Sequence, residues 1–252
     1  MKILLSPAKL MDLKTNLSIE KSTTPLFIDK TQKIQDKFKK LSPLQIKDLM
    51  NISDKLAQEN WERNQIWSPR PSVEESIQAF LAFKGEVFRG LNTESISVEK
   101  YNYVENSLFI LSGLYGILRP FDRIMPYRME MGIDFSKGKN KNLYQFWSKI
   151  ITEYLNYNID SEDFILNLAS KEYVKVVDRK ILKNKIIDIE FKENRNGKLM
   201  NIMTYFKNAR GKMARYCIDN EIHTVEDVKK FTIDNYSFSQ ALSTENNFVF
   251  IR

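Results

Sequence analysis

Met1-Lys2-Ile3-Leu4-Leu5-Ser6-Pro7 opens the chain with three apolar residues in a row, followed by a serine and a proline. An apolar run this short, ended by a turn signal, is typical of a buried strand. It is too short for a signal peptide, whose apolar segment has about 7–15 residues. Two more runs, Phe109-Ile110-Leu111 and Phe164-Ile165-Leu166, predict further strands of the same kind. The sequence therefore predicts a buried sheet to which residues 3–5 supply the first strand.

Helical signals stand between these strands. Ser42 and Gln45 form a capping box, with Pro43 at the first helical position. A second box joins Ser72 and Glu75 and predicts another helix. The apolar stripe of that helix would consist of Val73, Ile77, Phe80 and Leu81. Apolar residues at helical spacing predict one more helix over residues 146–155.

The last part of the chain mixes both kinds of element. Residues 186–191 and 199–206 fit two strands of a hairpin, because Asn196-Gly197 between them is the usual pair of a type I′ turn. We expect helices near residues 208–219 and 224–231, and a final strand over residues 248–251. Strands and helices are interspersed without a strict βαβ rhythm. The sequence predicts a mixed α/β (α+β) fold with a central mixed sheet, as one compact domain over residues 1–252.

The charge balance is basic, with 39 Lys and Arg against 32 Asp and Glu and a net charge of +7. A basic balance favours nucleic acid as a partner, but lysine-rich proteins without that role share it, so the distribution of charge must decide. A single cysteine, Cys217, excludes an internal disulfide and suits a reducing cytoplasm. Because His223 is the only histidine, a His/Cys metal cluster and a Ser-His-Asp triad are not expected.

The sequence lacks the glycine patterns that hold nucleotide phosphates, and it has no apolar run of the roughly 20 residues that a membrane helix needs. We expect a cytoplasmic protein with no cofactor, no metal site and no membrane segment. Direct binding of iron is improbable, since only oxygen ligands would remain.

Residues of about 42–63 have the outline of a helix-hairpin-helix. A first helix ends near Met50, a turn of Asn51, Ile52 and Ser53 follows, and Lys55 stands at the start of the second helix. Turn amides and a helix N-terminus of this kind hold a DNA phosphate. Asn51 and Ser53 replace the usual glycines, so a plain corner between two core helices remains the alternative.

The densest basic stretch lies at residues 207–215, and its cations are Lys207, Arg210, Lys212 and Arg215. On a helix starting near Asn208, Lys207 and Arg210 would oppose the helix dipole unless an anion docks there. We predict that these four residues contact DNA. A solvated basic face is the alternative.

Residues 111–132 combine two glycines after a buried strand with a proline-bounded turn rich in charge. The charged and aromatic residues of this turn are Arg119, Asp122, Tyr127, Arg128 and Glu130. They fit an ion network that holds a loop together, and equally a cleft for a phosphate or a base. Lys9 and Lys171 would complete such a cleft.

Several blocks spread along the chain together resemble the YaaA family of bacterial peroxide-stress proteins. They are residues 3–9, 52–57, 82–88, 111–132, 143–147, 167–170 and 209–211. The resemblance implies a cytoplasmic protein with a family-specific fold, a basic cleft and a helix-hairpin-helix at residues 49–57. It also implies binding to duplex, bubbled or junction DNA, and protection against hydrogen peroxide and iron-driven damage. It brings no catalytic residue.

Two functions follow from these observations. The first is a DNA-binding protein of the peroxide response that contacts phosphates without reading sequence. The second is an enzyme that acts on a nucleobase or nucleotide, with Lys9, Arg119, Tyr127, Arg128 and Lys171 holding an anion and Asp122 or Glu130 as acid or base. We favour binding over catalysis.

Overall fold

β1 (Lys2–Leu5) lies inside the main sheet, and strands from distant parts of the chain pair with both of its edges. The structure is a computed structural model and describes residues 1–15, 17, 19–134 and 142–252. The remaining strands of this sheet are β5 (Leu108–Ser112), β6 (Gly116–Leu118), β8 (Phe164–Asn167), β9 (Lys185–Arg195), β10 (Lys198–Met200), β11 (Ser237–Phe238) and β12 (Asn247–Ile251). Their order is β11-β12-β9-β8-β1-β5-β6, and β10 pairs with β9.

The middle of this sheet is parallel. β12, β9, β8, β1 and β5 run in one direction, whereas β11 and β6 are antiparallel to their neighbours. Ile3 of β1 is paired with Leu108 on one side and Leu166 on the other, and all three side chains are fully buried. Parallel strands covered on both faces carry continuous apolar runs. The strands predicted at residues 3–5, 109–111 and 164–166 are confirmed.

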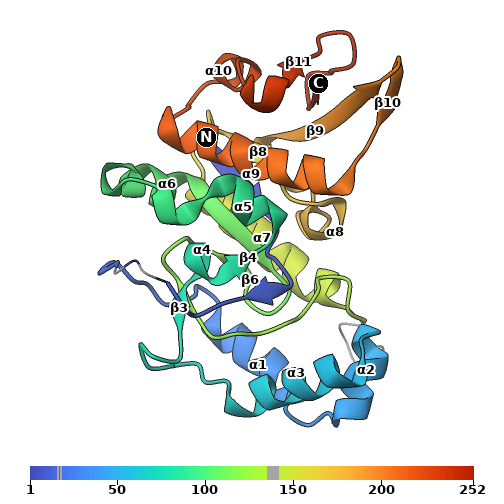
Figure 1. Ribbon diagram of the computed structural model, residues 1–252. Coiled ribbons are helices and arrows are strands. Elements are labelled where there is room, and N and C mark those ends of the chain that lie inside the picture. The colour runs from blue at the N-terminus through green and yellow to red at the C-terminus, as the bar shows by residue number, and fades with distance from the viewer. Residues whose placement is uncertain (16, 18, 135–141) are drawn as a thin grey trace.

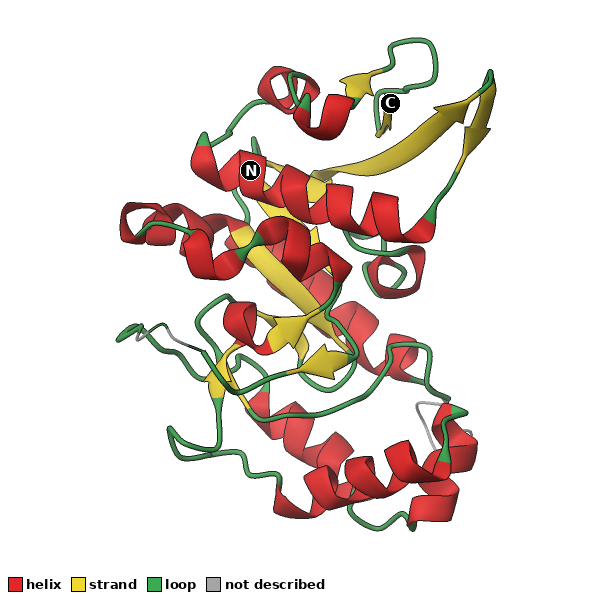
Figure 2. Ribbon diagram, viewed as in Figure 1, coloured by secondary structure: helices red, strands yellow, loops and turns green. Residues whose placement is uncertain are grey.

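Helices cover the sheet and form a further layer at one end (Figure 2). They are α1 (Ile28–Phe38), α2 (Pro43–Met50), α3 (Asp54–Ile66), α4 (Ala79–Ala82), α5 (Glu86–Leu91), α6 (Tyr101–Ser107), α7 (Leu143–Asn158), α8 (Lys171–Val174), α9 (Met203–Asp219) and α10 (Val225–Lys229). Figure 1 shows α5, α6 and α9 together in front of the sheet, and α1, α2 and α3 at the lower end. In the described residues, none of these helices has the length and apolar character needed to cross a membrane.

The capping box at the start of α2 forms as predicted. Ser42 Oγ accepts a hydrogen bond from the Gln45 amide at 3.3 Å, and Gln45 Oε1 accepts one from the Ser42 amide at 2.8 Å. The helix ends where Asn51 adopts a left-handed conformation with φ 50°. Ser53 then caps α3 through a 3.4 Å hydrogen bond to the Leu56 amide. Residues 43–66 are thus two helices joined by a three-residue turn.

The helix predicted from Ser72 over Ile77 and Phe80 is wrong. Half of its capping box forms, because the Ser72 amide donates to Glu75 Oε2 at 2.9 Å, but Val73 is 68% exposed. Residues 77–78 form β3 (Ile77–Gln78), which pairs with β7 (Arg123–Ile124). Tertiary pairing therefore overrides the local helix signal, and only the single turn α4 remains helical.

The hairpin predicted around Asn196-Gly197 is present, with positive φ at both residues. Its second strand is shorter than expected, because β10 ends at Met200 and residues 203–206 already belong to α9. The predicted start of this helix near Asn208 is therefore wrong by about one turn. Phe206 packs on the core and lies on the same helical stripe as buried Ala209 and Met213.

Two glycines bring α5 and α9 into backbone contact. A Cβ atom on Gly90 would lie 2.2 Å from the Asn208 carbonyl oxygen, and one on Gly211 would lie 1.8 Å from the Val87 carbonyl oxygen. Both distances are far below van der Waals contact, so only glycine fits at either position. The crossing fixes the part of α9 that carries Arg210.

Candidate functional site

The candidate site lies at the carboxyl ends of the parallel strands. β1 and β8 are neighbours, but the chain leaves β1 for β5 on one side and leaves β8 for β9 on the other. In open parallel sheets, ligands bind in the crevice beside such a pair of strands. The two loops are tied together here, since the Ser170 amide donates to Ser6 Oγ at 2.8 Å.

Lys9, Arg128 and Glu130 meet beside this crevice. Glu130 Oε1 lies 3.0 Å from Arg128 Nη2 and 3.4 Å from Lys9 Nζ. The second carboxylate oxygen, Glu130 Oε2, is buried and has no hydrogen-bond partner among the described residues. One carboxylate and two cations of the predicted cleft are therefore together, and one oxygen of that carboxylate has no hydrogen-bond partner among the described residues. Lys171 is far from this group in the chain but near it in space, because its neighbour Glu172 accepts a hydrogen bond from the Gly132 amide at 3.3 Å.

Tyr127 is not available as a stacking surface. Its ring is 5% exposed, and its hydroxyl shares a 2.6 Å hydrogen bond with Ser112 Oγ. Burial raises the pKa of Tyr127 well above its ordinary value, so the hydroxyl stays protonated. Tyr127 therefore belongs to the buried core.

Arg119 and Asp122 form an ion network of their own. Asp122 is fully buried and accepts hydrogen bonds from the Arg119 amide at 2.8 Å, the Arg119 guanidinium at 2.8 Å and the Thr23 hydroxyl at 2.6 Å. Arg119 also donates to the Thr24 carbonyl oxygen at 2.8 Å. Burial raises the pKa of Asp122, while these hydrogen bonds oppose that effect. The pair holds the 119–122 turn against residues 23–24.

A recess of about 400 Å³ lies beside the carboxyl end of β8. Its charged lining comprises four cations, Lys171, Lys175, Arg179 and Arg210, and two carboxylates, Asp188 and Glu190. Both carboxylates already have partners. Asp188 accepts from Asn167 Nδ2 and from Arg179 Nη2, each at 2.7 Å, and Glu190 lies 3.4 Å from Lys192.

Arg210 is the least satisfied cation of the recess. Its Nε is buried without a hydrogen-bond partner, and across the described chain its guanidinium makes no ion pair. The Phe206 ring lies 5.1 Å from the guanidinium carbon. Burial lowers the pKa of Arg210, although Glu190 and Asp188 oppose that effect from a distance. A desolvated guanidinium of this kind is a ready partner for an anion.

The other predicted basic residues of α9 differ from Arg210. Lys212 pairs with Asp234 at 2.6 Å, and Arg215 pairs with Asp219 at 2.7 Å and donates to Ser95 Oγ at 2.6 Å. These two cations therefore fix the packing of α9. Lys207 lies one turn before Arg210, on the same side of the helix, and has no ion pair in the described ranges. Neither Lys207 nor Arg210 lies at the helix N-terminus, so the predicted conflict with the helix dipole is absent.

The α2–α3 turn belongs to the helical layer at the lower end of Figure 1, away from α9. Lys55 is exposed there, as the prediction requires, and Ile52 donates its amide to the Lys47 carbonyl oxygen at 3.2 Å. Asp54 lies at the first position of α3 and pairs with Lys47 at 2.8 Å. The exposed carboxylate of Asp54 therefore lies in the first turn of α3, next to the Ser53 cap, and Lys47 neutralises it.

Sequence reasoning missed Lys175, Arg179, Asn167 and Asp188 as parts of the recess. Asn167 ends the buried strand β8, and a polar residue at that position was the available signal. Asp188 lies beside it in β9, where only the register of the sheet reveals the contact. Nowhere in the described ranges do three or more His, Cys, Asp or Glu side chains gather as metal ligands would.

Comparison with known proteins finds similarity along the chain. A family model described as "Peroxide stress protein YaaA" matches residues 1–242. The UPF0246 protein FP0718 of Flavobacterium psychrophilum is 42% identical over 252 residues, covering all of both chains. A UPF0246 protein of Flavobacterium johnsoniae is 40% identical, again over the full length of both chains.

Proposed function

Because the chain belongs to the peroxide stress protein YaaA family, we propose that it binds nucleic acid as part of the response to hydrogen peroxide. The contacts are made to backbone phosphates, at the cationic recess beside the end of β8 and residues 188–190 of β9. The observation that carries this proposal is the half-buried guanidinium of Arg210, whose buried Nε has no hydrogen-bond partner among the described residues.

A buried cation without a partner opposes folding, because removal from water is not offset by another interaction. A phosphate oxygen is the natural complement of the Arg210 guanidinium, which presents its donors in a planar fork. Duplex DNA carries phosphates outward, so one phosphate reaches the recess while its neighbours contact the rim.

The rim supplies further cations. Lys171 and Lys175 line the recess, and Lys207 lies one turn before Arg210 on α9. None of the three has a carboxylate partner in the described part of the chain, and Lys175 lies 4.9 Å from the Tyr144 ring. Together with Arg210 they form a group of unpaired positive charges. Phosphate contacts of this kind position a strand without reading its bases, so the proposed binding is not specific for sequence.

Protection from iron-driven damage follows from the same contacts. Each phosphate that a lysine or arginine neutralises releases condensed counterions. Fe²⁺ bound to the DNA backbone is among the ions displaced, so less iron remains where peroxide would produce damage. This route needs neither a metal site nor a catalytic residue in the protein.

The test is a salt-titrated binding series on duplex, bubble and junction DNA, comparing wild type with Arg210→Gln. We expect the variant to bind about tenfold more weakly, since a charge-assisted hydrogen bond to phosphate is lost. The slope of log K against log salt should decrease in magnitude by about 0.9, as for one lost phosphate contact.

Lys212→Gln is the matched control, because it removes one charge from the same helix, at a cation that Asp234 already engages. It should leave both the affinity and the slope close to those of wild type. Wild-type binding that is absent at low salt, or equal at about 50 and 300 mM salt, would refute the proposal.

Catalysis on a nucleobase or nucleotide is a second candidate, favoured by the buried, unpartnered Oε2 of Glu130 beside Lys9 and Arg128. A carboxylate oxygen with no partner is free to accept a proton from a substrate held by the two cations. Incubation with nucleotides and damaged duplexes should then yield a product that Glu130→Gln does not form. Absence of product from the wild type excludes this candidate.

A further inference from the structure

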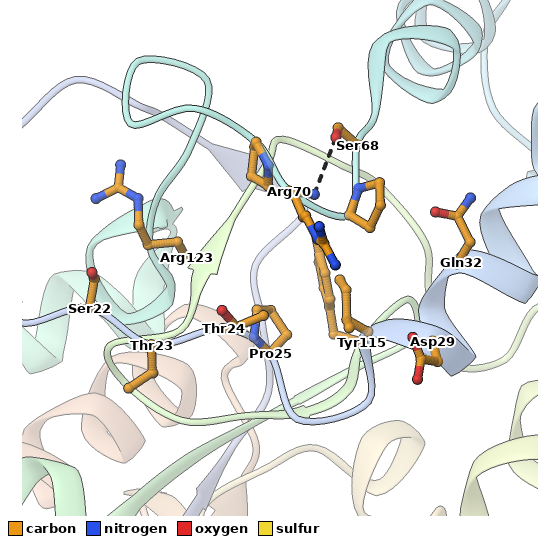
Figure 3. Close-up of a pocket in the computed structure, with 13 residues that line it drawn as sticks. Ser22, Thr23, Thr24, Pro25, Asp29, Gln32, Ser68, Arg70, Tyr115 and Arg123 are labelled. Carbon is orange, nitrogen blue, oxygen red and sulfur yellow. Dashed lines mark hydrogen bonds between the residues drawn. The ribbon is translucent and has the colours of Figure 1, made fainter.

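A second and larger cavity lies away from the carboxyl ends of the strands. It has a volume of about 660 Å³ and lies between residues 22–25, the start of α1, the loop that follows α3, and β7. Figure 3 shows Arg70 reaching into it from the loop, with Asp29 and Gln32 of α1 on one side and Ser22 and Arg123 on the other. No residue of this cavity lines the recess that contains Arg210.

Two arginines, Arg70 and Arg123, line this cavity, and neither makes an ion pair within the described ranges. Figure 3 shows the Arg70 guanidinium in the cavity and the Arg123 guanidinium turned away from it. Arg123 is fixed by neutral oxygens, since it donates to Ser76 Oγ at 3.0 Å, to the Val73 carbonyl oxygen at 2.6 Å and to the Ser76 carbonyl oxygen. Its Nη1 makes no hydrogen bond within the described ranges. The Arg70 side chain likewise has no hydrogen bond or ion pair there.

The loop that carries Arg70 is held in place. The Arg70 amide donates to Ser68 Oγ at 3.2 Å, and Pro69 and Pro71 on either side restrict the backbone. A fixed backbone limits the positions that the Arg70 guanidinium can reach, which lowers the entropy lost when it binds an anion.

The remaining wall of the cavity is apolar and rigid. It consists of Pro25, Pro69, Pro71, Ile28 and one edge of Tyr115. Tyr115 is fixed because its hydroxyl accepts a hydrogen bond from Trp67 Nε1 at 3.0 Å. Flat apolar walls suit a planar heterocycle, and the Asp29 carboxylate and Gln32 amide nearby offer hydrogen bonds to its polar edge.

We propose that this cavity binds a nucleotide, with the phosphate on Arg70 and the base against the proline wall. Inorganic phosphate would leave the apolar wall uncovered, and a nucleoside would leave the Arg70 guanidinium unpaired. The volume accommodates a mononucleotide, but a cavity of this size cannot admit a base-paired duplex. The ligand is a free nucleotide or the phosphorylated end of an unpaired strand.

Calorimetric titration with adenosine 5′-monophosphate, adenosine and inorganic phosphate tests the proposal. Adenosine 5′-monophosphate should bind more tightly than either part alone, and Arg70→Gln should weaken it about tenfold. Arg70→Lys should restore part of the loss, because it keeps the charge but not the planar fork. Lys33→Gln is the matched control, since Lys33 is exposed on α1 and does not line the cavity.

Two further arms separate the sources and the sites. A short unpaired strand with a 5′-phosphate, compared with the same strand ending in a hydroxyl, distinguishes a strand end from a free nucleotide. Arg210→Gln should leave nucleotide binding unchanged, and Arg70→Gln should leave duplex binding unchanged. The proposal is overturned if wild type binds no nucleotide, if phosphate binds as tightly as the nucleotide, or if Arg70→Gln and wild type are equal.

Discussion

At the scale of single residues, the structure separates cations that stabilise the fold from cations that do not. Lys212 and Arg215 of α9 have carboxylate partners, whereas Arg210 on the same helix is half-buried, with a buried Nε that has no partner among the described residues. The sequence pattern gave these residues equal weight, because partners such as Asp234 come from another part of the chain. Burial and pairing, rather than the density of charge, distinguish the cation without an ion pair from those that have one.

Replacement of Arg210 by methionine should make the free protein more stable. Methionine fills similar space without a buried charge, so we expect the free energy of unfolding to rise by about 1 kcal/mol. Urea denaturation measures this change. Lys212→Met, which leaves Asp234 without its partner, should not show it. A loss of stability in Arg210→Met equal to that of Lys212→Met would mean that Arg210 has a structural partner.

Cys217 should not react with peroxide in the native protein. It is fully buried, and burial raises the pKa of its thiol far above the ordinary value, so the thiolate that attacks peroxide does not form across the physiological pH range. Mass spectrometry after hydrogen peroxide or iodoacetamide treatment should show an unmodified thiol in buffer and a modified one in urea. Modification of the native protein at equal rate would contradict this expectation.

At the scale of secondary structure elements, the crossing of α5 and α9 determines where the recess forms. Gly90 and Gly211 let the two backbones touch, and Arg210 precedes one of these glycines directly. The helices themselves are short or weakly amphipathic, so their positions depend on this contact more than on local propensity.

Gly211→Ala should destabilise the protein by about 3 kcal/mol, since its Cβ would overlap the Val87 carbonyl oxygen of α5. Thermal or urea unfolding measures the change. Gly132→Ala is the control, because a Cβ there would meet nothing closer than 3.6 Å. Equal stability of the two variants would show that α5 and α9 separate without cost.

The elements that the sequence predicted well are those with strong local signals. Continuous apolar runs gave the buried parallel strands, and the Ser42–Gln45 box gave the start of α2. The prediction failed from Ser72 because Ile77 finds a strand partner at Ile124, which no local pattern reveals. The candidate site was predicted only in part, because some of its contacts depend on how the strands pair. Lys9, Arg128 and Glu130 were predicted and lie together. Asp188 lines the recess because of the register of β9 on β8, which the sequence does not reveal.

At the scale of the whole molecule, both described chain ends are held by the main sheet. The Met1 amino group pairs with Asp163 at 2.5 Å, and Arg252 pairs with Glu193 at 2.8 Å. Arg252 also lies between the rings of Tyr205 and Tyr236, which connects the last strand to α9. Ion pairs thus hold the first and last residues against the rest of the protein.

Arg252→Gln should therefore lower the free energy of unfolding by about 1–3 kcal/mol, because Glu193 is buried and would keep its charge without its cation. Chemical denaturation provides the measurement. Lys185→Gln breaks an exposed pair with Glu245 and should change stability by about 0–1 kcal/mol at most. A smaller effect for Arg252→Gln than for Lys185→Gln would show that the last residue is not anchored.

The unpaired Arg210 has a consequence for the amount of protein in a cell. Under the proposed function, the unliganded chain leaves the half-buried charge of Arg210 without a counter-charge, so it should open more often and be more exposed to proteases. A bound phosphate stabilises only the folded form and so extends the lifetime of each loaded molecule. Proteolysis would then remove unliganded molecules first. The steady-state level of the protein would therefore follow the concentration of its ligand, without any dedicated regulator.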